Sequence, residues 1–249
     1  KVFTDNIDSE TISQLTNLLN QTFTSDSQVR IMPDTHAGKG CVIGTTMTIT
    51  NRIVPNLVGV DIGCGMRVVK LAEKHLDLPN LDSVIHKYVP AGFEIHKEAL
   101  ASSGAADILA PVNVDKAFKS LGTLGGGNHF IEVDADKNGD YWLVIHTGSR
   151  HLGIEVCDYY QSLAYENLKL KQHDGKTIQE LSRELVANYT KADRKKEISK
   201  ALKKLRSDYK ATHVTVPFEL AYLEGQAMQD YLHDMKLAQE HAKINRETI

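Results

Sequence analysis

The sequence is poor in the features that mark secreted and membrane proteins. Only three of its 249 residues are cysteine, and aromatic residues make up 6%. Cys41, Cys64 and Cys157 are too few and too scattered for a disulfide framework. No apolar run approaches the ~20 residues that span a bilayer, and the N-terminal stretch KVFTDNIDSE lacks an apolar signal core. We therefore expect a cytoplasmic protein with reduced cysteines and no membrane partner.

The sequence also lacks a strong excess of charge of either sign, since the formal net charge is −3. A nucleic-acid partner would therefore need a local basic patch. Residues 190–206 offer one, with eight Lys and Arg residues against two acidic residues. This segment is either a solvated helix face or a surface that follows a phosphate backbone. In the second case Lys203, Lys204 and Arg206 are candidates for RNA contact.

The spacing of apolar residues predicts a mixed α+β protein. The expected helices are 8–23, 81–88, 152–171, 177–205 and 219–245. The expected strands, rich in Val, Ile and Thr and bounded by Gly, Pro or Asn, are 29–32, 42–50, 58–62, 66–71, 130–133 and 141–145. Strands joined through glycine-rich loops, without regular β–α–β spacing, argue against a doubly wound parallel sheet.

Four glycine-rich segments in the first 150 residues place Asp, Cys, His or Arg beside glycine. They are PDTHAGKG (33–40), VGVDIGCGMR (58–67), GGGNHF (125–130) and HTGSR (146–150). One such segment could be an ordinary turn, but four are more than turns require. Glycine beside a strand often marks a close approach of the backbone to another group. The segment with Lys39 lacks the GxxxxGK[ST] pattern, which excludes a P-loop.

Four side chains in these segments form a candidate set of metal ligands. Asp61 and Cys64 share one tight loop, His129 follows three glycines, and His146 ends an apolar strand. Taken singly, they could be a turn, a buried cysteine and satisfied histidines. Together they offer O, S, N and N donors for a divalent transition metal, and the softness of thiolate and imidazole favours zinc over manganese.

Two of these segments end in an arginine. Arg150 in HTGSR and Arg67 in CGMR each place a cation near glycine amides, an arrangement that suits a phosphate oxygen. For both arginines, a surface salt bridge is the alternative.

In that order, PDTHAGKGCVIG, VGVDIGCGMR, LGTLGGGNHFIEV and HTGSRHLG resemble the motifs of the RtcB family of RNA-splicing ligases. The segment AQEHAKINRETI at the C-terminal end is also similar to the family's helix at that point. The resemblance covers nearly the whole chain. It implies a single RtcB-like catalytic domain over residues 1–249, with several β-strand layers and flanking helices.

The resemblance also implies an activity and its partners. The family joins RNA ends that carry a 2′,3′-cyclic phosphate or 3′-phosphate to 5′-hydroxyl ends, using GTP and two Mn²⁺ ions, in splicing or repair. The manganese use comes from the resemblance and conflicts with the softness argument for zinc.

The resemblance assigns roles to individual residues. Asp61, Cys64, His129 and His146 match family metal ligands, with Cys64 bridging two ions. Asn128 matches a contact to the guanylate phosphate, Glu132 a position near the nucleotide, and Arg150 an RNA-phosphate contact. Asp34 and His36 belong to the neighbourhood of the site. The family's further histidine ligand and its guanylylated histidine match nothing in this sequence, so we expect them beyond Ile249, as in a chain truncated at its C-terminus.

Two other functions fit parts of the sequence. A metal-dependent cyclic phosphodiesterase would need the same ligands and no guanylylated histidine. A non-catalytic RNA-binding module would instead use the basic segment 190–206, and its RNA affinity would fall steeply with salt.

Overall fold

The computed structural model describes residues 1–212 and 214–249, and it confirms the α+β class. The chain divides into two compact units. Unit 1 comprises Lys1–Leu57 and Gln161–Leu223, and unit 2 comprises Val58–Tyr160 and Glu224–Ile249. Among the described residues, no helix has both the length and the apolar character that crossing a bilayer requires.

Unit 1 combines small antiparallel sheets with helices. Its elements are α1 (Ser9–Leu19), η1 (Thr22–Thr24), β1 (Val29–Ala37), β2 (Val42–Met47), β3 (Arg52–Ile53), α2 (Pro55–Val58, whose last residue belongs to unit 2), the second half of α5 (His151–Lys171), α6 (Ile178–Lys191), η3 (Lys195–Glu197), α7 (Ile198–Lys210), η4 (Phe218–Leu220) and β7 (Leu223–Glu224). Strands β1 and β2 pair with each other, as do β3 and β7.

The core of unit 1 lies between α1 and the β1–β2 pair. Asp8 caps α1 by accepting a hydrogen bond from Thr11 N at 2.9 Å. The helix then buries Leu15 and Leu18 in a cluster with Ile31 and Val42. A register shift between Ile31 and His36 interrupts the β1–β2 ladder.

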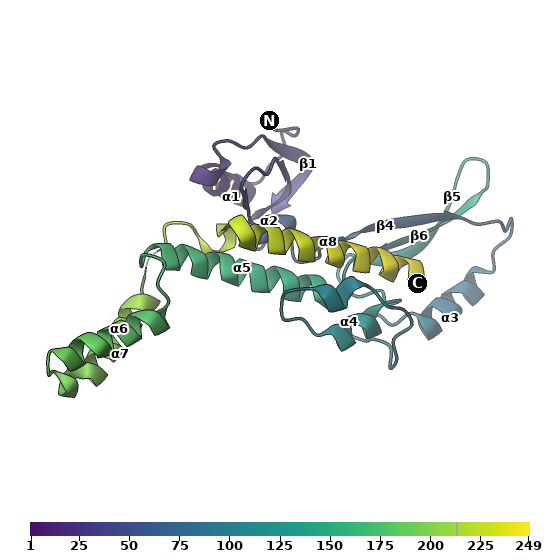
Figure 1. Cartoon of the computed structure of the whole chain (residues 1–249). Coiled ribbons are helices and arrows are strands. Elements are labelled where there is room, and N and C mark those ends of the chain that lie inside the picture. Colours follow the sequence, from purple (N-terminus) through teal and green to yellow (C-terminus); the bar gives the residue numbers. More distant parts are fainter. Residues whose placement is uncertain (213) are drawn as a thin grey trace. The chain divides into compact units, whose positions relative to one another are not determined.

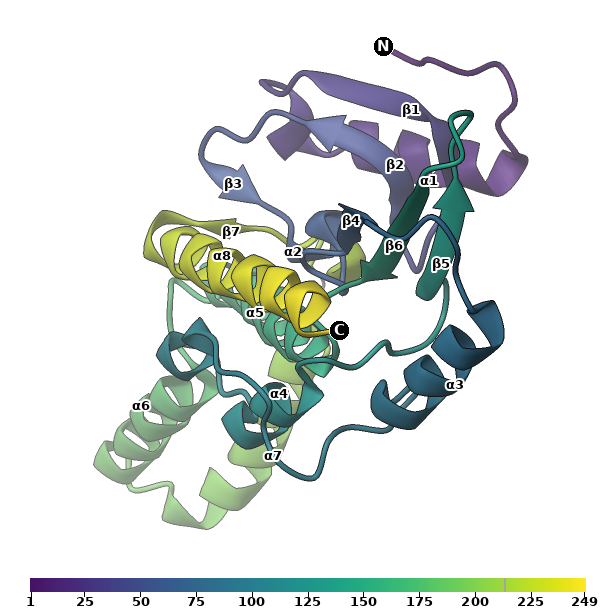
Figure 2. The same cartoon turned by 90° about the vertical axis from the view of Figure 1, so that its right-hand side faces the viewer.

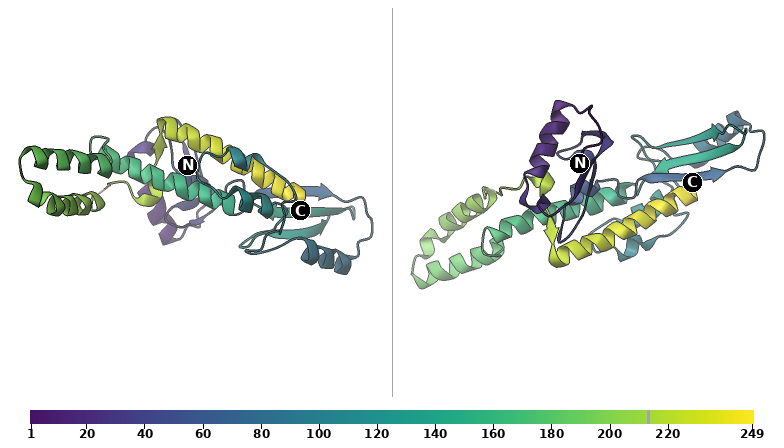
Figure 3. Two further views of the ribbon diagram at one scale, coloured as in Figure 1. Left: turned by 60° about the horizontal axis from the view of Figure 1, so that its bottom comes forward. Right: turned by 90° about the horizontal axis from the view of Figure 1, so that it is seen from above.

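Helices α6 and α7 form an antiparallel hairpin, visible in green in Figures 2 and 3. A capping box of Thr177 and Glu180 starts α6. Asp193, with a φ of 55°, ends it and lets the chain reverse through η3. The base of the hairpin is joined by a 2.8 Å contact between His173 Nε2 and Thr212 Oγ1.

Unit 2 contains a three-stranded antiparallel sheet with helices around it. Its elements are β4 (Gly65–Lys70), α3 (Leu78–Tyr88), η2 (Gly104–Asp107), α4 (Val114–Ser120), β5 (Phe130–Ala135), β6 (Tyr141–Thr147), the first half of α5 and α8 (Gly225–Thr248). The strand order is β4-β6-β5, with the three strands side by side in Figure 1.

Helix α8 runs beside the first half of α5 (Figure 1), and buried polar groups join them. Asp234 is fully buried on α8 and accepts hydrogen bonds from Leu109 N, Ala110 N and Tyr160 Oη at 2.8 to 2.9 Å. Burial, with the hydrogen bond to Asp234, raises the pKa of Tyr160. These bonds fix α8 to α5 and to the loop after η2.

Most expected elements are present, at shifted boundaries. The strands expected at 130–133 and 141–145 are β5 and β6, and the helix expected at 152–171 is α5. The helical region 177–205 is confirmed but is divided into α6 and α7. Strand β1 extends through Ala37, so most of the first glycine-rich segment is strand rather than loop.

Two expectations are wrong. Residues 58–62 form no strand, because Gly59 (φ 99°) and Gly63 (φ 79°) hold conformations that an extended strand cannot contain. The helix expected from 219 begins only at Gly225, because the preceding residues form η4 and then β7, whose Leu223 is fully buried. The sequence also gave no indication of α4.

His241 makes stability depend on pH. It is fully buried on α8, and Nδ1 lies 2.8 Å from Ser103 Oγ, while Nε2 has no hydrogen-bond partner among the described residues. Burial lowers the pKa of His241 to about 4.

We predict that acid weakens the fold through this residue. Between pH 6.5 and 4 the unfolded chain binds a proton that the folded chain does not, so stability falls as pH falls. Urea unfolding at pH 7.5 and pH 5 should show a loss of about 2 kcal/mol that is absent from His241→Gln. An equal pH dependence in both proteins would contradict the assignment.

Candidate metal centre

The topology of the unit 2 sheet brings three candidate ligands to one edge. Strand β6 runs antiparallel to both neighbours, with Gly65 opposite Thr147 and Phe130 opposite His146. The first residues of β4 and β5 therefore lie beside the last residues of β6. Cys64 and His129 immediately precede β4 and β5, and His146 is near the end of β6.

The fourth side chain comes from the loop before Cys64. Cys64 N donates a 3.0 Å hydrogen bond to Asp61 O, which closes a tight turn. Ile62, inside this turn, is 1% exposed and anchors it. Asp61 and Cys64 can therefore both reach the sheet edge.

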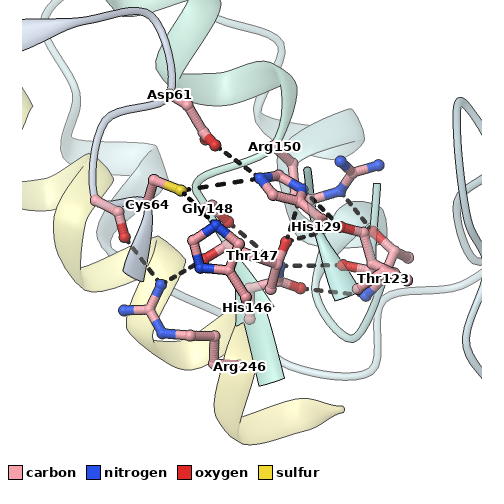
Figure 4. A network of polar contacts seen from close by, with 12 residues as sticks. Asp61, Cys64, Thr123, His129, His146, Thr147, Gly148, Arg150 and Arg246 are labelled. Carbon is pink, nitrogen blue, oxygen red and sulfur yellow. Dashed lines mark hydrogen bonds and ion pairs between the residues drawn. The ribbon is translucent and has the colours of Figure 1, made fainter. Parts of the chain in front are cut away.

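Asp61, Cys64 and His129 lie close together, and His146 contacts Cys64 (Figure 4). Asp61 Oδ2 lies 2.8 Å from His129 Nε2, and Cys64 Sγ lies 3.5 Å from His146 Nε2 and 4.0 Å from His129 Nε2. The potential ligand atoms of Asp61, Cys64 and His129 all lie within 4.8 Å of one another. The His146 ring stacks on Phe130, with ring centroids 5.2 Å apart.

The orientation of His129 suits a metal ligand. Its Nδ1 lies 2.9 Å from the carbonyl oxygen of Leu124. Because that oxygen can only accept, Nδ1 carries a proton, and Nε2 is the ring nitrogen that faces Asp61 and Cys64. Thr147 Oγ1 donates to the same carbonyl at 2.7 Å. Together with the mixed O, S and N donors, this geometry fits a divalent transition metal.

Cys64 would have to lose a proton on binding a metal. Burial, reinforced by the charge of Asp61, raises the pKa of the Cys64 thiol to about 11. Since only the thiolate is a good ligand, metal binding would release this proton.

A cavity of about 550 Å³ adjoins the cluster at Asp61 and His129. Its lining is mostly apolar, from side chains such as Val60, Ile95 and Ile154. The polar groups in the lining, several of them potential anion ligands, are Asp61, Lys116, Ser120, Asn128, His129, Arg150 and His151. The cavity therefore combines apolar walls with a few polar groups, as small-molecule sites do.

Arg150 is held firmly beside this cavity. It has a φ of 59°, and Nε donates to Thr123 Oγ1 while Nη2 donates to Gly92 O, both at 2.9 Å. A Cβ on Gly125 would lie 1.6 Å from Arg150 Nη1, so the first glycine of GGGNHF leaves room for this guanidinium.

Glu132 and Arg67 lie outside the lining of the cavity. Glu132 shares the sheet face of Phe130 and His146, two residues along β5, beside Met66 and Trp142. Arg67 lies on the opposite face and forms a 2.8 Å ion pair with Glu247 of α8. The structure thus shows for Arg67 the salt bridge that the sequence offered as the alternative to a phosphate contact. A phosphate contact by Arg67 and a place for Glu132 near the nucleotide stay predictions.

Asp34, His36 and Lys39 belong to unit 1, in and just after β1. Sequence reasoning missed Asn245 and Arg246, near the end of α8, which contact the ligand-bearing segments. An asparagine inside a helix is unfavourable without a local reason, and that was the one available signal.

A sequence model of the family described as tRNA-splicing ligase RtcB matches residues 14–112 and 110–249. The RNA-splicing ligase RtcB of Escherichia coli K12 is 34% identical over 168 residues, which cover 57% of this chain and 41% of that protein. The tRNA-splicing ligase RtcB of Methanococcus maripaludis is 32% identical over 203 residues, covering 57% of this chain and 42% of that protein.

The chain belongs to the RtcB family. The matches span less than half the length of these two relatives.

We predict that Gly148→Ala weakens metal binding. A Cβ at Gly148 would lie 1.9 Å from Asp61 Oδ1, so the carboxylate would have to move away from His129. Calorimetric titration with Mn²⁺ or Zn²⁺ should show a loss of about tenfold or more. Gly126→Ala is the matched control, since its Cβ would meet nothing closer than 3.8 Å. Equal affinity in both variants would contradict the placement of Asp61 as a ligand.

Proposed function

We propose that this chain carries the metal- and phosphate-binding part of an RNA ligase. The ligase would join 2′,3′-cyclic phosphate or 3′-phosphate ends to 5′-hydroxyl ends, with GTP and Mn²⁺. The observation that carries the proposal is the convergence of Asp61, Cys64, His129 and His146 at one sheet edge, beside a cavity lined by Asn128 and Arg150. The family membership supports the same activity.

In this proposal each residue has a separate role in binding metal, nucleotide or RNA. Asp61, Cys64, His129 and His146 would hold two divalent ions. When bound, such ions neutralise charge that develops on phosphoryl oxygens. Asn128, exposed at the cavity wall, would donate its amide to a guanylate phosphate, and Glu132 would lie nearer the rest of the nucleotide. Arg150, fixed by Thr123 and Gly92, would present its remaining donors to an RNA phosphate.

The identity of the metal rests on two opposed arguments. One thiolate and two imidazoles favour zinc by softness, whereas the family resemblance favours manganese. We propose manganese as the working ion, because the Asp61 carboxylate supplies an oxygen ligand and the adjoining cavity of about 550 Å³ leaves room for phosphate oxygens, which also suit manganese.

A cyclic phosphodiesterase is the second candidate. The described donors would be sufficient for it, and residues 1–249 contain no motif for a guanylylated histidine. Under the ligase proposal that histidine lies beyond Ile249, and residues 1–249 act within a single cytoplasmic catalytic domain.

An RNA-binding module is the third candidate. Lys203, Lys204 and Arg206 are all exposed on α7. Lys204 is already paired with Asp208 at 2.6 Å, which leaves less free positive charge than the sequence suggested. This surface fits an auxiliary RNA contact better than a complete binding site.

We predict that the chain retains Mn²⁺ in native mass spectra and gains no GMP in denaturing spectra after incubation with GTP. Cys64→Ala should lose the metal because it removes the central donor. Cys41→Ala, which changes a buried cysteine of unit 1, should keep it. A GMP adduct would contradict the placement of the nucleophile beyond Ile249, and absence of metal from the unmodified chain would contradict the site.

An RNA with a 2′,3′-cyclic phosphate separates the three functions. Opening of the phosphate with turnover in Mn²⁺ alone, abolished by Cys64→Ala, would favour the phosphodiesterase. Tight binding without turnover, lost steeply with salt, would favour the RNA-binding module. If this RNA is joined to a 5′-hydroxyl RNA end only when GTP and a longer polypeptide containing this chain are both present, the result would support the ligase.

A further inference from the structure

The last turns of α8 contact every segment that carries a ligand of the candidate metal centre. Asn245 is fully buried and uses both atoms of its amide. Oδ1 accepts from Gly122 N at 2.8 Å and Thr123 N at 3.1 Å. Nδ2 donates to Thr123 O at 3.1 Å, Gly148 O at 3.3 Å and Thr147 Oγ1 at 3.4 Å. One side chain thus joins the segment before His129 to the segment after His146.

Arg246 makes the remaining connection. Its Nη1 donates to Gly63 O at 2.8 Å and to Thr147 O at 2.7 Å, as Figure 4 shows. Gly63 immediately precedes Cys64, and Thr147 follows His146. A planar guanidinium therefore fixes the Asp61–Cys64 loop against the end of β6.

These bonds act on the ligands through the backbone. Thr123 is next to Leu124, whose carbonyl orients the His129 ring. Thr147 donates to the same carbonyl and also receives a bond from Asn245. A shift at either α8 residue would therefore change the separations among Asp61, Cys64, His129 and His146, although neither residue is itself a ligand.

We propose that Asn245 and Arg246 are positioning residues that set the affinity and geometry of the metal centre. This inference rests on the proposed metal site, but it concerns residues outside the ligand set. A residue with a merely structural role would change the melting temperature without changing how the thiolate meets the metal.

Cobalt(II) titration of the chain tests the proposal, because Co²⁺ reports thiolate ligation as a charge-transfer absorption band. Arg246→Ala should weaken Co²⁺ binding about 10- to 100-fold and diminish the band. Arg246→Lys, which keeps a cationic donor, should recover part of both. Asn245→Ala should behave like Arg246→Ala. If Asn245→Ala does not fold, the partly exposed Arg246 still provides the test.

Two further variants make the outcomes distinct. Glu247→Gln alters the next residue of α8, which pairs with Arg67 on the sheet, and should leave affinity and band unchanged. Cys64→Ser should remove the band. If Arg246→Ala binds Co²⁺ with wild-type affinity and an unchanged band, and Cys64→Ser shows no band, the positioning role alone would be overturned. Absence of a thiolate band in the wild-type chain would overturn both this inference and the proposed metal site.

Discussion

The antiparallel pairing of β6 with both β4 and β5 is the constraint on which the site depends. Two strands that begin at the same edge, with a third that ends there, bring together residues 64, 129 and 146. Because side chains alternate along a strand, a slip of one residue in either ladder would turn His146 away from Phe130 and Cys64. The register of one small sheet thus decides whether the four donors can meet.

The glycines around this edge serve the same geometry. Gly148 leaves space for the Asp61 carboxylate, and Gly125 leaves space for the Arg150 guanidinium. In both places the backbone of one segment approaches the polar end of a side chain from another. A side chain on either glycine would displace a functional group, which explains why glycines stand beside the strands of this sheet.

Much of the fold could be predicted from local pattern. Strands β5 and β6 and helix α5 follow from alternation and helical spacing within single segments. The error at 58–62 arose because Val58, Val60 and Ile62 alternate as a strand does, whereas the positive φ values at Gly59 and Gly63 convert the segment into a loop. The chemistry of the side chains and the family motifs selected Asp61, Cys64, His129 and His146, which the structure brings to one end of the sheet, and their role as ligands stays a prediction. Asn245 and Arg246 were missed because their partners lie about 100 or more residues away in sequence.

The α6–α7 hairpin has a consequence for how the chain can vary. Its base is joined by His173 and Thr212, and the ring of His173 stacks on Tyr209 at 4.7 Å. The hairpin therefore begins and ends at neighbouring points within unit 1, while the candidate metal ligands all belong to unit 2. The entropic cost of closing a loop grows only slowly with its length. The hairpin could therefore be lengthened, shortened or opened to new termini with little effect on the candidate metal centre.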